Sequence, residues 1–466
     1  MSSLDDLGAL EREDLVLLIR RLVAENAELR RRIAELERGG NRPAAPFSKN
    51  RRKHNPKPSG RKPGEGEFRT RIEPEATLPP VEVTLAPEQQ RCTCGGCVVE
   101  DGTERVTITE MPKIEPRVRA YDVATGRCQT CGRRWRAKHP QLPPDQTGAT
   151  AHRVAPEVYA TAHTLHYAFG LTTHKVARVL KHLFNIRLTQ SAITQNALRT
   201  AHGALAPVHG NLIEKVRGAE VLTTDDTSWR INGNTAFLMG FDSDQATVYQ
   251  IRDQHRHQEV LEVIGPDFAG TLSTDRGPSY DARALSAIPQ NKCTAHLLRN
   301  IRQAQEGQSP QAQTVGWQLA DLVRRANGLW WAFKQQKISR EEFDQRARVL
   351  KEELSRALNP RRILRIRDPD NRRLLRELAW HHKRGSLLRF LDDPTIEPTN
   401  NRAERALRPA VIVRKVSQCS KNHRGAQATA VITSILQTAA KHGMDLLETL
   451  RQALNSENPF DAIPAR

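Results

Sequence analysis

The segment from residue 221 to residue 275 alternates short apolar runs with turns, and two of these runs end at an aspartate. The first run, Val221–Thr224, leads directly into Asp225 and Asp226, and the last leads into Asp275. Apolar runs of this length, bounded by polar residues, predict strands, and the longer amphipathic run among them predicts a helix. We therefore predict strands at 221–224, 235–241, 246–251 and 270–274, and a helix at 258–264.

Three strands, a helix and a fourth strand form the element order of an RNase H-like sheet, in which the first and fourth strands are neighbours. The predicted fold class is therefore α/β, with Asp225 and Asp275 side by side at one edge. Adjacent carboxylates repel each other unless cations lie between them, and such oxygen ligands suit Mg²⁺ or Mn²⁺. Two ions about 3.5–4 Å apart can support in-line attack on phosphorus.

A third carboxylate is expected from a later helix that crosses the same edge. Glu404 fits this role, because Thr399 or Asn400 can cap a helix that begins just before it. Acids at strand ends are often plain loop or cap residues, so each of the three is weak evidence alone. Their order along the chain favours a catalytic metal site formed by Asp225, Asp275 and Glu404.

Several motifs together resemble one enzyme family. They are Asp225-Asp-Thr, Asp275-Arg-Gly-Pro-Ser-Tyr280, Cys293-Thr-Ala-His296 and Asn400-Asn-Arg-Ala-Glu404-Arg-Ala-Leu-Arg408-Pro, followed by Arg414-Lys415 and Gly425. The set is similar to that of the DDE transposases of the insertion sequence 66 family, and the likeness extends upstream over nearly the whole chain. It implies that Asp225, Asp275 and Glu404 bind the catalytic metal ions. Asp226 is the alternative to Asp225, since the family more often has Glu at that position.

The resemblance also implies a catalytic domain at 215–466 with a helical insertion at about 300–392. Its substrate would be double-stranded DNA, both element ends and target, with small accessory proteins encoded beside it. Arg405, Arg408, Arg414 and Lys415 follow Glu404 and are candidates for holding a DNA backbone, unless they form a solvated charged face. Cys293 and His296 have the spacing of half a metal site, but without a second pair we expect a structural role.

The insertion is rich in arginine and contains three tryptophans. The cations are Arg361, Arg362, Arg365, Arg367, Arg372, Arg373 and Arg376, and the aromatic residues are Trp330, Trp331 and Trp380. Tryptophans can stack on bases or pack in a core, and we expect packing for most of these.

Residues 9–38 predict one helix with a heptad repeat. Leu15, Leu22, Leu29 and Leu36 recur every seven residues, with Ile19, Asn26 and Ile33 at the complementary positions. Leu at d, Ile at a and one Asn at a favour a parallel two-stranded coiled coil, which would occupy residues 1–40 and form a homodimer or part of a higher assembly. The alternative is an amphipathic helix packed on its own domain.

The chain is strongly basic, with 72 Lys and Arg against 53 Asp and Glu and a net charge of +19. This favours a polyanionic partner, nucleic acid before membrane. Ten of the cations lie between Asn41 and Arg71, together with five prolines. The linker at 41–75 is therefore either a solvated tether or a DNA-binding arm, with Arg51, Arg52, Lys53, Arg61 and Lys62 as its contact residues.

Five of the seven cysteines lie between residues 76 and 140. Cys94 and Cys97 form one CxxC pair and Cys128 and Cys131 another, with strand-like alternation at 106–109 and 118–123 between them. Four thiolates at this spacing predict a zinc ribbon, in which the metal ion replaces a core too small to hold itself. Cys92 can substitute for Cys94 or Cys97 as a ligand.

Residues 150–212 are helical in pattern. A helix preceded by Thr172 and a second one capped by Thr189 or Ser191 could form a DNA-binding helix-turn-helix, although ordinary packing explains the pattern equally well.

The sequence thus predicts a DNA transposase that cuts element ends and joins them to target DNA, with Mg²⁺ or Mn²⁺ in the catalytic site and a structural Zn²⁺. The rivals are a zinc-ribbon regulator without catalysis and an RNase H-like nuclease that cuts but does not join. The amino terminus is acidic, unlike a secretory signal, and no apolar run is long enough for a membrane span. We expect a cytoplasmic, nucleoid-associated protein.

Overall fold

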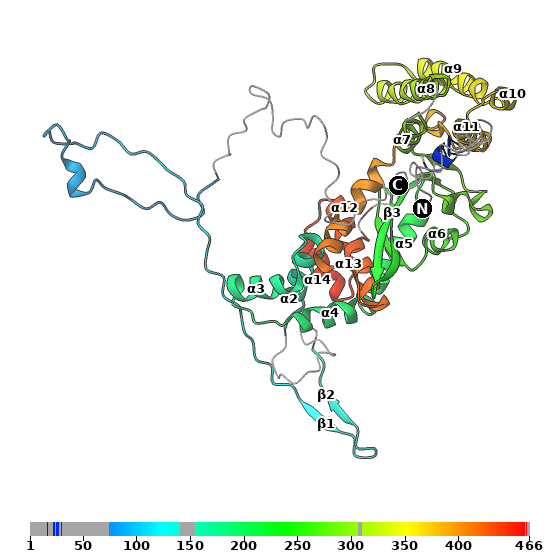
Figure 1. Cartoon of the computed structure of the whole chain (residues 1–466). Coiled ribbons are helices and arrows are strands. Elements are labelled where there is room, and N and C mark those ends of the chain that lie inside the picture. The colour runs from blue at the N-terminus through cyan, green and yellow to red at the C-terminus, as the bar shows by residue number, and fades with distance from the viewer. Residues whose placement is uncertain are drawn as a thin grey trace, which may run out of the picture. The chain divides into compact units, whose positions relative to one another are not determined.

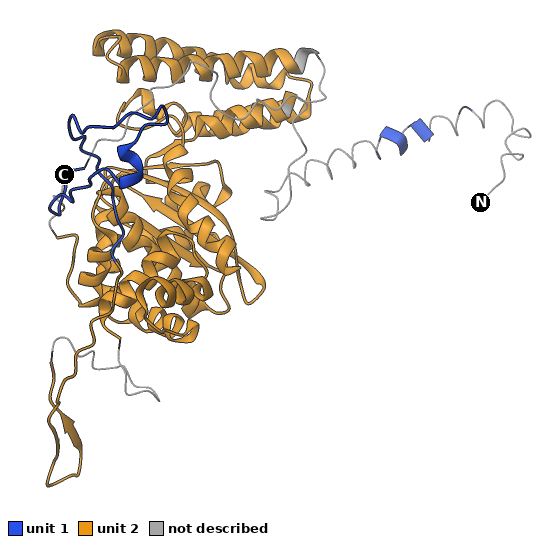
Figure 2. Cartoon of the chain, turned by 90° about the vertical axis from the view of Figure 1, so that its left-hand side faces the viewer, with its two compact units in different colours: residues 1–112 blue, residues 113–466 orange. Residues whose placement is uncertain are grey.

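The computed structural model describes residues 74–139, 154–305, 310–461 and 463, together with seven residues between 16 and 29. The chain divides into two compact units, residues 1–112 and 113–466 (Figure 2). The described residues between 16 and 29 are all helical, which agrees with the helix predicted there. The rest of the predicted coiled coil and most of the basic linker, including Arg51, Arg52, Lys53, Arg61 and Lys62, lie outside the described residues.

The cysteine-containing segments form turns, with less sheet than predicted. A short 3₁₀ turn at Pro87–Gln90 precedes a bridge between Arg91 and Cys97, and β1 (Thr125–Arg127) pairs with β2 (Arg134–Arg136) in an antiparallel hairpin. The predicted strands at 106–109 and 118–123 are wrong, because residues 98–124 contain no regular structure and their valines and isoleucines are mostly exposed. Alternation favours a strand only where a partner strand and a core are present.

The second unit is built on a five-stranded sheet with the order β5-β4-β3-β6-β7. β3, β4 and β5 are antiparallel, whereas β6 and β7 run parallel to β3. Asn232 and Gly233, with φ of 51° and 81°, close the hairpin between β3 and β4, as Asn-Gly turns do. The strands are Val221–Ile231 (β3), Asn234–Asp242 (β4), Thr247–Arg252 (β5), Thr271–Thr274 (β6) and Gln290–Lys292 (β7).

Helices cover both faces of this sheet (Figure 1). α5 (Leu205–Arg217) and α6 (His257–Ile264) lie on one side, where they share a core with Met239 and Phe241. α12 (Asn401–Ser417) lies on the other, where Leu407 packs near Leu238 and Tyr249. α13 (His423–Lys441) runs along the outer strand β5, whose backbone N–H groups at Thr247 and Tyr249 donate to Thr438 and Ser434. These hydroxyls accept hydrogen bonds from backbone N–H groups of the edge strand that could otherwise pair with another strand.

Before α5 the chain forms α2 (Pro156–His163), α3 (Thr173–Phe184) and α4 (Gln190–His202). Thr172 and Thr189 cap α3 and α4 through bonds from Lys175 N and Ala192 N, so Thr189 and not Ser191 is the cap of the second helix. α4 packs against α13, and α2 packs against α14 (Leu446–Leu454). Packing thus accounts for the apolar face of α4. Binding of α3 and α4 to a DNA groove as a helix-turn-helix stays a prediction.

Five α-helices lie between β7 and α12 in the described part of the chain, in the region of the predicted insertion. Its helices are α7 (Thr294–Gln305), α8 (Pro310–Lys334), α9 (Arg340–Ala357), α10 (Pro360–Leu364) and α11 (Pro369–Lys383). They share a core of their own around Phe343 and Leu378. Trp330 is 5% exposed in that core, but Trp331 and Trp380 remain 56% and 41% exposed, so the packing prediction holds for Trp330 alone. Within the described residues, no helix is both long and apolar enough to cross a membrane.

Candidate active site

The parallel pairing of β3 with β6 determines where the two aspartates lie. The pairing ends at Thr223 and Ser273. Asp225 and Asp275 each lie two residues farther along, Asp225 still within β3 and Asp275 directly after β6. The sequence predicts that the first strand ends before Asp225, but β3 continues to Ile231 as a hairpin with β4. Asp225 therefore stands where β3 loses its parallel neighbour.

The register of β3 and β4 distinguishes Asp225 from Asp226. Asp225 pairs with Gly240 and Asp226 with Met239, and paired residues point to the same face of a sheet. A Cβ on Gly240 would lie 2.9 Å from Leu407 of α12, so Asp225 faces α12. Asp226 faces the other side of the sheet, where its Oδ1 lies 3.2 Å from His255 Nδ1.

Asn400 connects α12 to the sheet beside Asp225. Its Nδ2 donates to the carbonyl of Thr224 at 2.7 Å, and its backbone N–H donates to Cys293 Sγ at 3.1 Å. The carbonyl of Asn400 accepts the backbone N–H of Glu404 at 3.2 Å. Glu404 thus lies in the first turn of a helix whose start is joined to β3 and to the residue after β7. Asn400 occupies the cap position, but its side chain makes no capping bond: Nδ2 donates to Thr224, and Oδ1 is buried without a hydrogen-bond partner in the described part of the chain.

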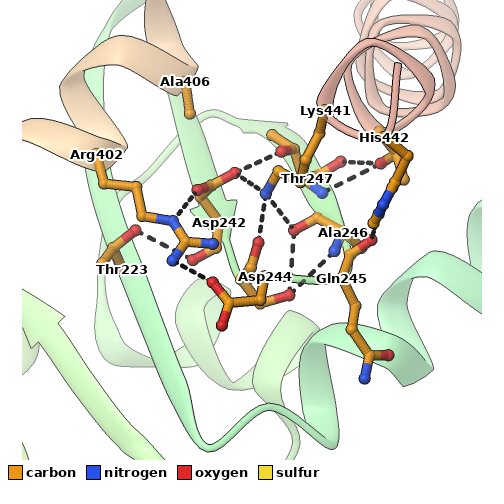
Figure 3. A network of polar contacts seen from close by, with 12 residues as sticks. Thr223, Asp242, Asp244, Gln245, Ala246, Thr247, Arg402, Ala406, Lys441 and His442 are labelled. Carbon is orange, nitrogen blue, oxygen red and sulfur yellow. Dashed lines mark hydrogen bonds and ion pairs between the residues drawn. The ribbon is translucent and has the colours of Figure 1, made fainter. Parts of the chain in front are cut away.

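A second set of contacts fixes the same end of α12 (Figure 3). Arg402 bonds Asp242 Oδ2 at 2.6 Å and Asp244 Oδ1 at 2.5 Å, and Lys441 of α13 bonds Asp242 Oδ1 at 2.6 Å. Asp242 is buried at the end of β4, so a charge there is stable only when paired. Tyr249 adds a bond from its hydroxyl to the carbonyl of Ala406. These contacts orient the helix face that carries Glu404.

The carboxylates of the site affect one another. Burial, together with the negative charges of Asp226, Asp275 and Glu404, raises the pKa of Asp225 to about 7, against the bond from Asp226 N. Burial and the Asp275 charge also raise the pKa of Asp226, although His255 opposes this shift. An excess of buried negative charge is what a divalent cation neutralises. The donor chemistry of Asp225, Asp275 and Glu404 therefore fits Mg²⁺ or Mn²⁺.

The side chains do not form a preassembled metal cluster. Within the part of the chain that the structure describes, no three His, Cys, Asp or Glu side chains converge closely enough to hold an ion. Asp275 Oδ1 is instead occupied by the backbone N–H of Gly277 at 2.8 Å. Metal binding by the three carboxylates accordingly stays a prediction.

The loop after Asp275 is anchored by buried charges. Arg276, whose side chain is 5% exposed, lies 3.2 Å from Glu377 of α11 through its Nη1. Lys292 of β7 lies 2.9 Å from Asp281 and donates to Thr274 Oγ1 at 3.2 Å. Burial lowers the pKa of Lys292, while the Asp281 carboxylate opposes that shift. The ion pair between Arg276 and Glu377 joins the insertion to the residue that follows Asp275.

The other predicted site residues fall into different surroundings. Arg405, Arg408 and Lys415 are exposed on α12, whereas Arg414 bonds Thr227 Oγ1 at 3.0 Å and braces α12 against β3. Cys293 is buried and accepts the bond from Asn400, which agrees with a structural role. The sequence analysis did not identify Arg402, Tyr249 or His255. Each contacts a residue that is distant in the sequence, so no local motif marks it.

The two CxxC pairs lie in separate units, one ending at Pro112 and the other beginning at Lys113, so shared zinc ligation stays a prediction. Each pair forms a tight turn, with Gly95 at φ 91° and Gly132 at φ 69°. Hydrogen bonds from Cys94 lower the pKa of the Cys92 thiol, and hydrogen bonds from Cys131 lower that of Cys128. A lowered thiol pKa favours the thiolate that binds metals.

Comparison with known proteins agrees with the resemblance seen in the sequence. A stretch of 72 residues, 16% of this chain, is 40% identical to the uncharacterized protein y4qI of Sinorhizobium fredii (strain NBRC 101917 / NGR234), of which it covers 13%. The model of the Transposase IS66 family matches residues 152–428, more than half of the chain, and includes Asp225, Asp275 and Glu404. The chain therefore belongs to the Transposase IS66 family.

Proposed function

We propose that this protein is a DNA transposase that binds the ends of a mobile element, hydrolyses a phosphodiester at each end and transfers the freed 3′-hydroxyl to target DNA. The observation that supports the proposal is the pKa of Asp225, which the charges of Asp275 and Glu404 help to raise. Asp225 lies on β3, Asp275 directly follows the parallel strand β6, and Glu404 lies in the turn of α12 that Asn400 joins to β3. Family membership supports a transposase role.

The catalytic domain is RNase H-like in this proposal. Support comes from the sheet order β5-β4-β3-β6-β7, with three antiparallel strands followed by two parallel ones. In such a sheet an acid on the first strand and an acid after the fourth meet at one edge, and a later helix supplies the third.

Asp225, Asp275 and Glu404 would hold the divalent ions. Ions bound there would lower the pKa of an attacking water or hydroxyl and stabilise the leaving oxygen. In the first step water would attack phosphorus, the bond from phosphorus to the 3′-oxygen would break, and the leaving 3′-oxygen would take up the proton that the water releases. In the second step that 3′-hydroxyl would attack a target phosphodiester and form a new bond from its oxygen to phosphorus, and the target 3′-oxygen would leave with the proton that the attacking hydroxyl releases. Both steps are in-line displacements, so one site can serve both without a covalent protein intermediate.

The amino-terminal segments would recognise and pair the DNA ends in this proposal. A coiled coil at residues 1–40 would join two protomers, and a Zn²⁺-bound ribbon and the basic arm would contact double-stranded DNA near the nucleoid. Exposed Arg405, Arg408 and Lys415 on α12 would face the backbone next to the carboxylates. Accessory proteins encoded by the element could complete the assembly.

Replacement of Asp275 tests this function. We expect Asp275→Asn to abolish cleavage and strand transfer on labelled end duplexes with Mg²⁺, while end binding in a gel-shift assay is kept. Asp267→Asn, which changes an exposed carboxylate of the same domain, serves as the matched control and should remain active. Equal activity of Asp275→Asn and wild type would refute the assignment. Cutting without joining would indicate a nuclease, and binding without cutting a regulator.

A further inference from the structure

The last two helices of the insertion carry a large excess of positive charge. Residues 360–384 contain nine Lys or Arg and three Asp or Glu. Helix α9 of the same insertion contains five of each. The charge of the insertion is therefore concentrated in α10, α11 and the residues that flank them.

The two regions also differ in how their charges are paired. On α9, Arg340 pairs with Asp344 at 2.9 Å and Arg346 pairs with Glu342 at 2.5 Å. Around α10 and α11 five exposed arginines have no ion pair with any described residue: Arg361, Arg365, Arg367, Arg373 and Arg376. We call these five residues the arginine surface. Like charges packed this densely repel one another unless a polyanion neutralises them.

The two sides of α11 are sharply different. Asn371, Leu374, Leu375, Leu378 and His381 are buried against the insertion core. The opposite side carries Arg373, Arg376, Trp380 and Lys383 at intervals of three and four residues, all exposed. The guanidinium of Arg384 lies 4.5 Å from the centre of the Trp380 ring. An exposed cationic stripe that includes an aromatic ring is typical of surfaces that follow a nucleic-acid strand.

This stripe borders the candidate active site. Glu377 lies between Arg373 and Trp380 on α11 and contacts Arg276, the residue that follows Asp275. Arg373 lies one helical turn from Glu377, on the same side of the helix. The contact between Glu377 and Arg276 thus fixes α11 beside the loop that carries Asp275.

We propose that the arginine surface binds the backbone phosphates of the DNA strand that extends from the active site. The inference rests on the proposed function, because it assigns the bound polyanion to the DNA substrate. Arg373 and Arg376 of the arginine surface also belong to the exposed stripe on α11. This stripe, from Arg373 to Lys383, is about 15 Å long at 1.5 Å per residue. With one phosphate per roughly 3.4 Å of strand, it spans about four nucleotides. Phosphate contacts of this kind position DNA without reading its sequence.

The test is the salt dependence of DNA binding by the full chain. The test variant carries Arg365→Gln, Arg367→Gln, Arg373→Gln and Arg376→Gln. The control variant carries Arg340→Gln, Arg346→Gln, Arg348→Gln and Arg356→Gln on α9, which removes the same charge from the same insertion. Fluorescence anisotropy with a labelled mixed-sequence duplex, at about 50 to 200 mM KCl, gives the slope of log K against log salt. Each lost phosphate contact should reduce the slope by about one.

We expect a slope reduced by about three to four in the test variant and by less than about one in the control variant. Arg→Lys at the same four positions should restore most of the slope, which separates charge from folding. Equal slopes in the two Gln variants would overturn the proposal. It would also be overturned if the test variant lost binding to an RNA strand but bound the DNA duplex as well as wild type does. Metal-dependent cleavage and the effect of Asp275→Asn are independent of this slope, so the proposed function can stand if the arginine surface fails.

Discussion

Asn400 joins the start of α12 to β3 and to the residue after β7 through hydrogen bonds. Its amide reaches the backbone beside Asp225, its N–H reaches Cys293, and its carbonyl begins the turn that carries Glu404. A displacement of about 1 Å at a catalytic group can cost roughly 100-fold in rate. Asn400 is therefore a positioning residue, whose effect should appear in the chemical step.

We expect Asn400→Ala to reduce the single-turnover cleavage rate at saturating DNA by roughly 10- to 100-fold, with little change in the DNA dissociation constant. The reason is that the carbonyl of Thr224 loses its partner and α12 loses its link to β3. Asn401→Ala, at the exposed neighbouring amide, is the matched control. A rate for Asn400→Ala equal to that of Asn401→Ala would show that the link does not position Glu404.

At the scale of single residues, the sequence predicted three catalytic carboxylates but not the residues that hold their elements in place. Asp225, Asp275 and Glu404 were recognisable because strand ends and a motif mark them. The sequence left Asp226 open as the alternative to Asp225, and the pairing of Asp225 with Gly240 shows that Asp225 is the one that faces α12. The sequence predicted Asn400 as a possible helix cap. An asparagine that joins the start of a helix to a strand cannot be distinguished from a cap by residue type alone.

Helices were more predictable than strands at the scale of elements. Thr172 and Thr189 mark the starts of α3 and α4 through local hydrogen bonds, which sequence spacing can reveal. β7 was not predicted, because its Gln290, Asn291 and Lys292 are polar although all are buried. Their burial depends on Tyr280, Glu397 and Asp281, which are distant in the sequence. The opposite error at 106–109 and 118–123 has the same origin, since alternation there has no partner strand.

Helix α2 contains a buried histidine that makes stability depend on pH. His163 Nε2 lies 2.8 Å from Asn196 Oδ1 of α4, and burial lowers its pKa to about 4. The unfolded chain, with a pKa near 6.5, takes up the proton first as pH falls. The folded state therefore loses stability from about pH 6.5 down to about pH 4, by roughly 2 kcal/mol at about pH 5.

We expect His163→Gln to make the urea midpoint less sensitive to a change from about pH 7 to about pH 5. Half-buried His209 and buried His381, whose pKa values are also lowered to about 4, should leave part of the pH dependence in place. His182→Gln, at an exposed site on α3, is the control and should behave like wild type. An unchanged pH sensitivity in His163→Gln would contradict this interpretation of His163.

Across the whole molecule, the family match covers the part of the chain that contains the candidate site. The Transposase IS66 family model matches residues 152–428, which contain Asp225, Asp275 and Glu404. The predicted coiled coil, basic arm and zinc ribbon lie upstream of that match and rest on local sequence patterns. The net charge of +19 suits a protein that handles DNA, and the arginine surface assigns part of that charge to a particular place.

Titration of the protein with Mn²⁺, monitored by electron paramagnetic resonance, needs neither an end sequence nor a target. We expect Asp225→Asn, Asp275→Asn and Glu404→Gln each to weaken Mn²⁺ binding by at least about tenfold. Asp226→Asn, one residue away on the opposite face of β3, should bind Mn²⁺ nearly as well as wild type. Wild-type affinity in all three variants, or a loss confined to Asp226→Asn, would contradict a shared metal site at this edge of the sheet.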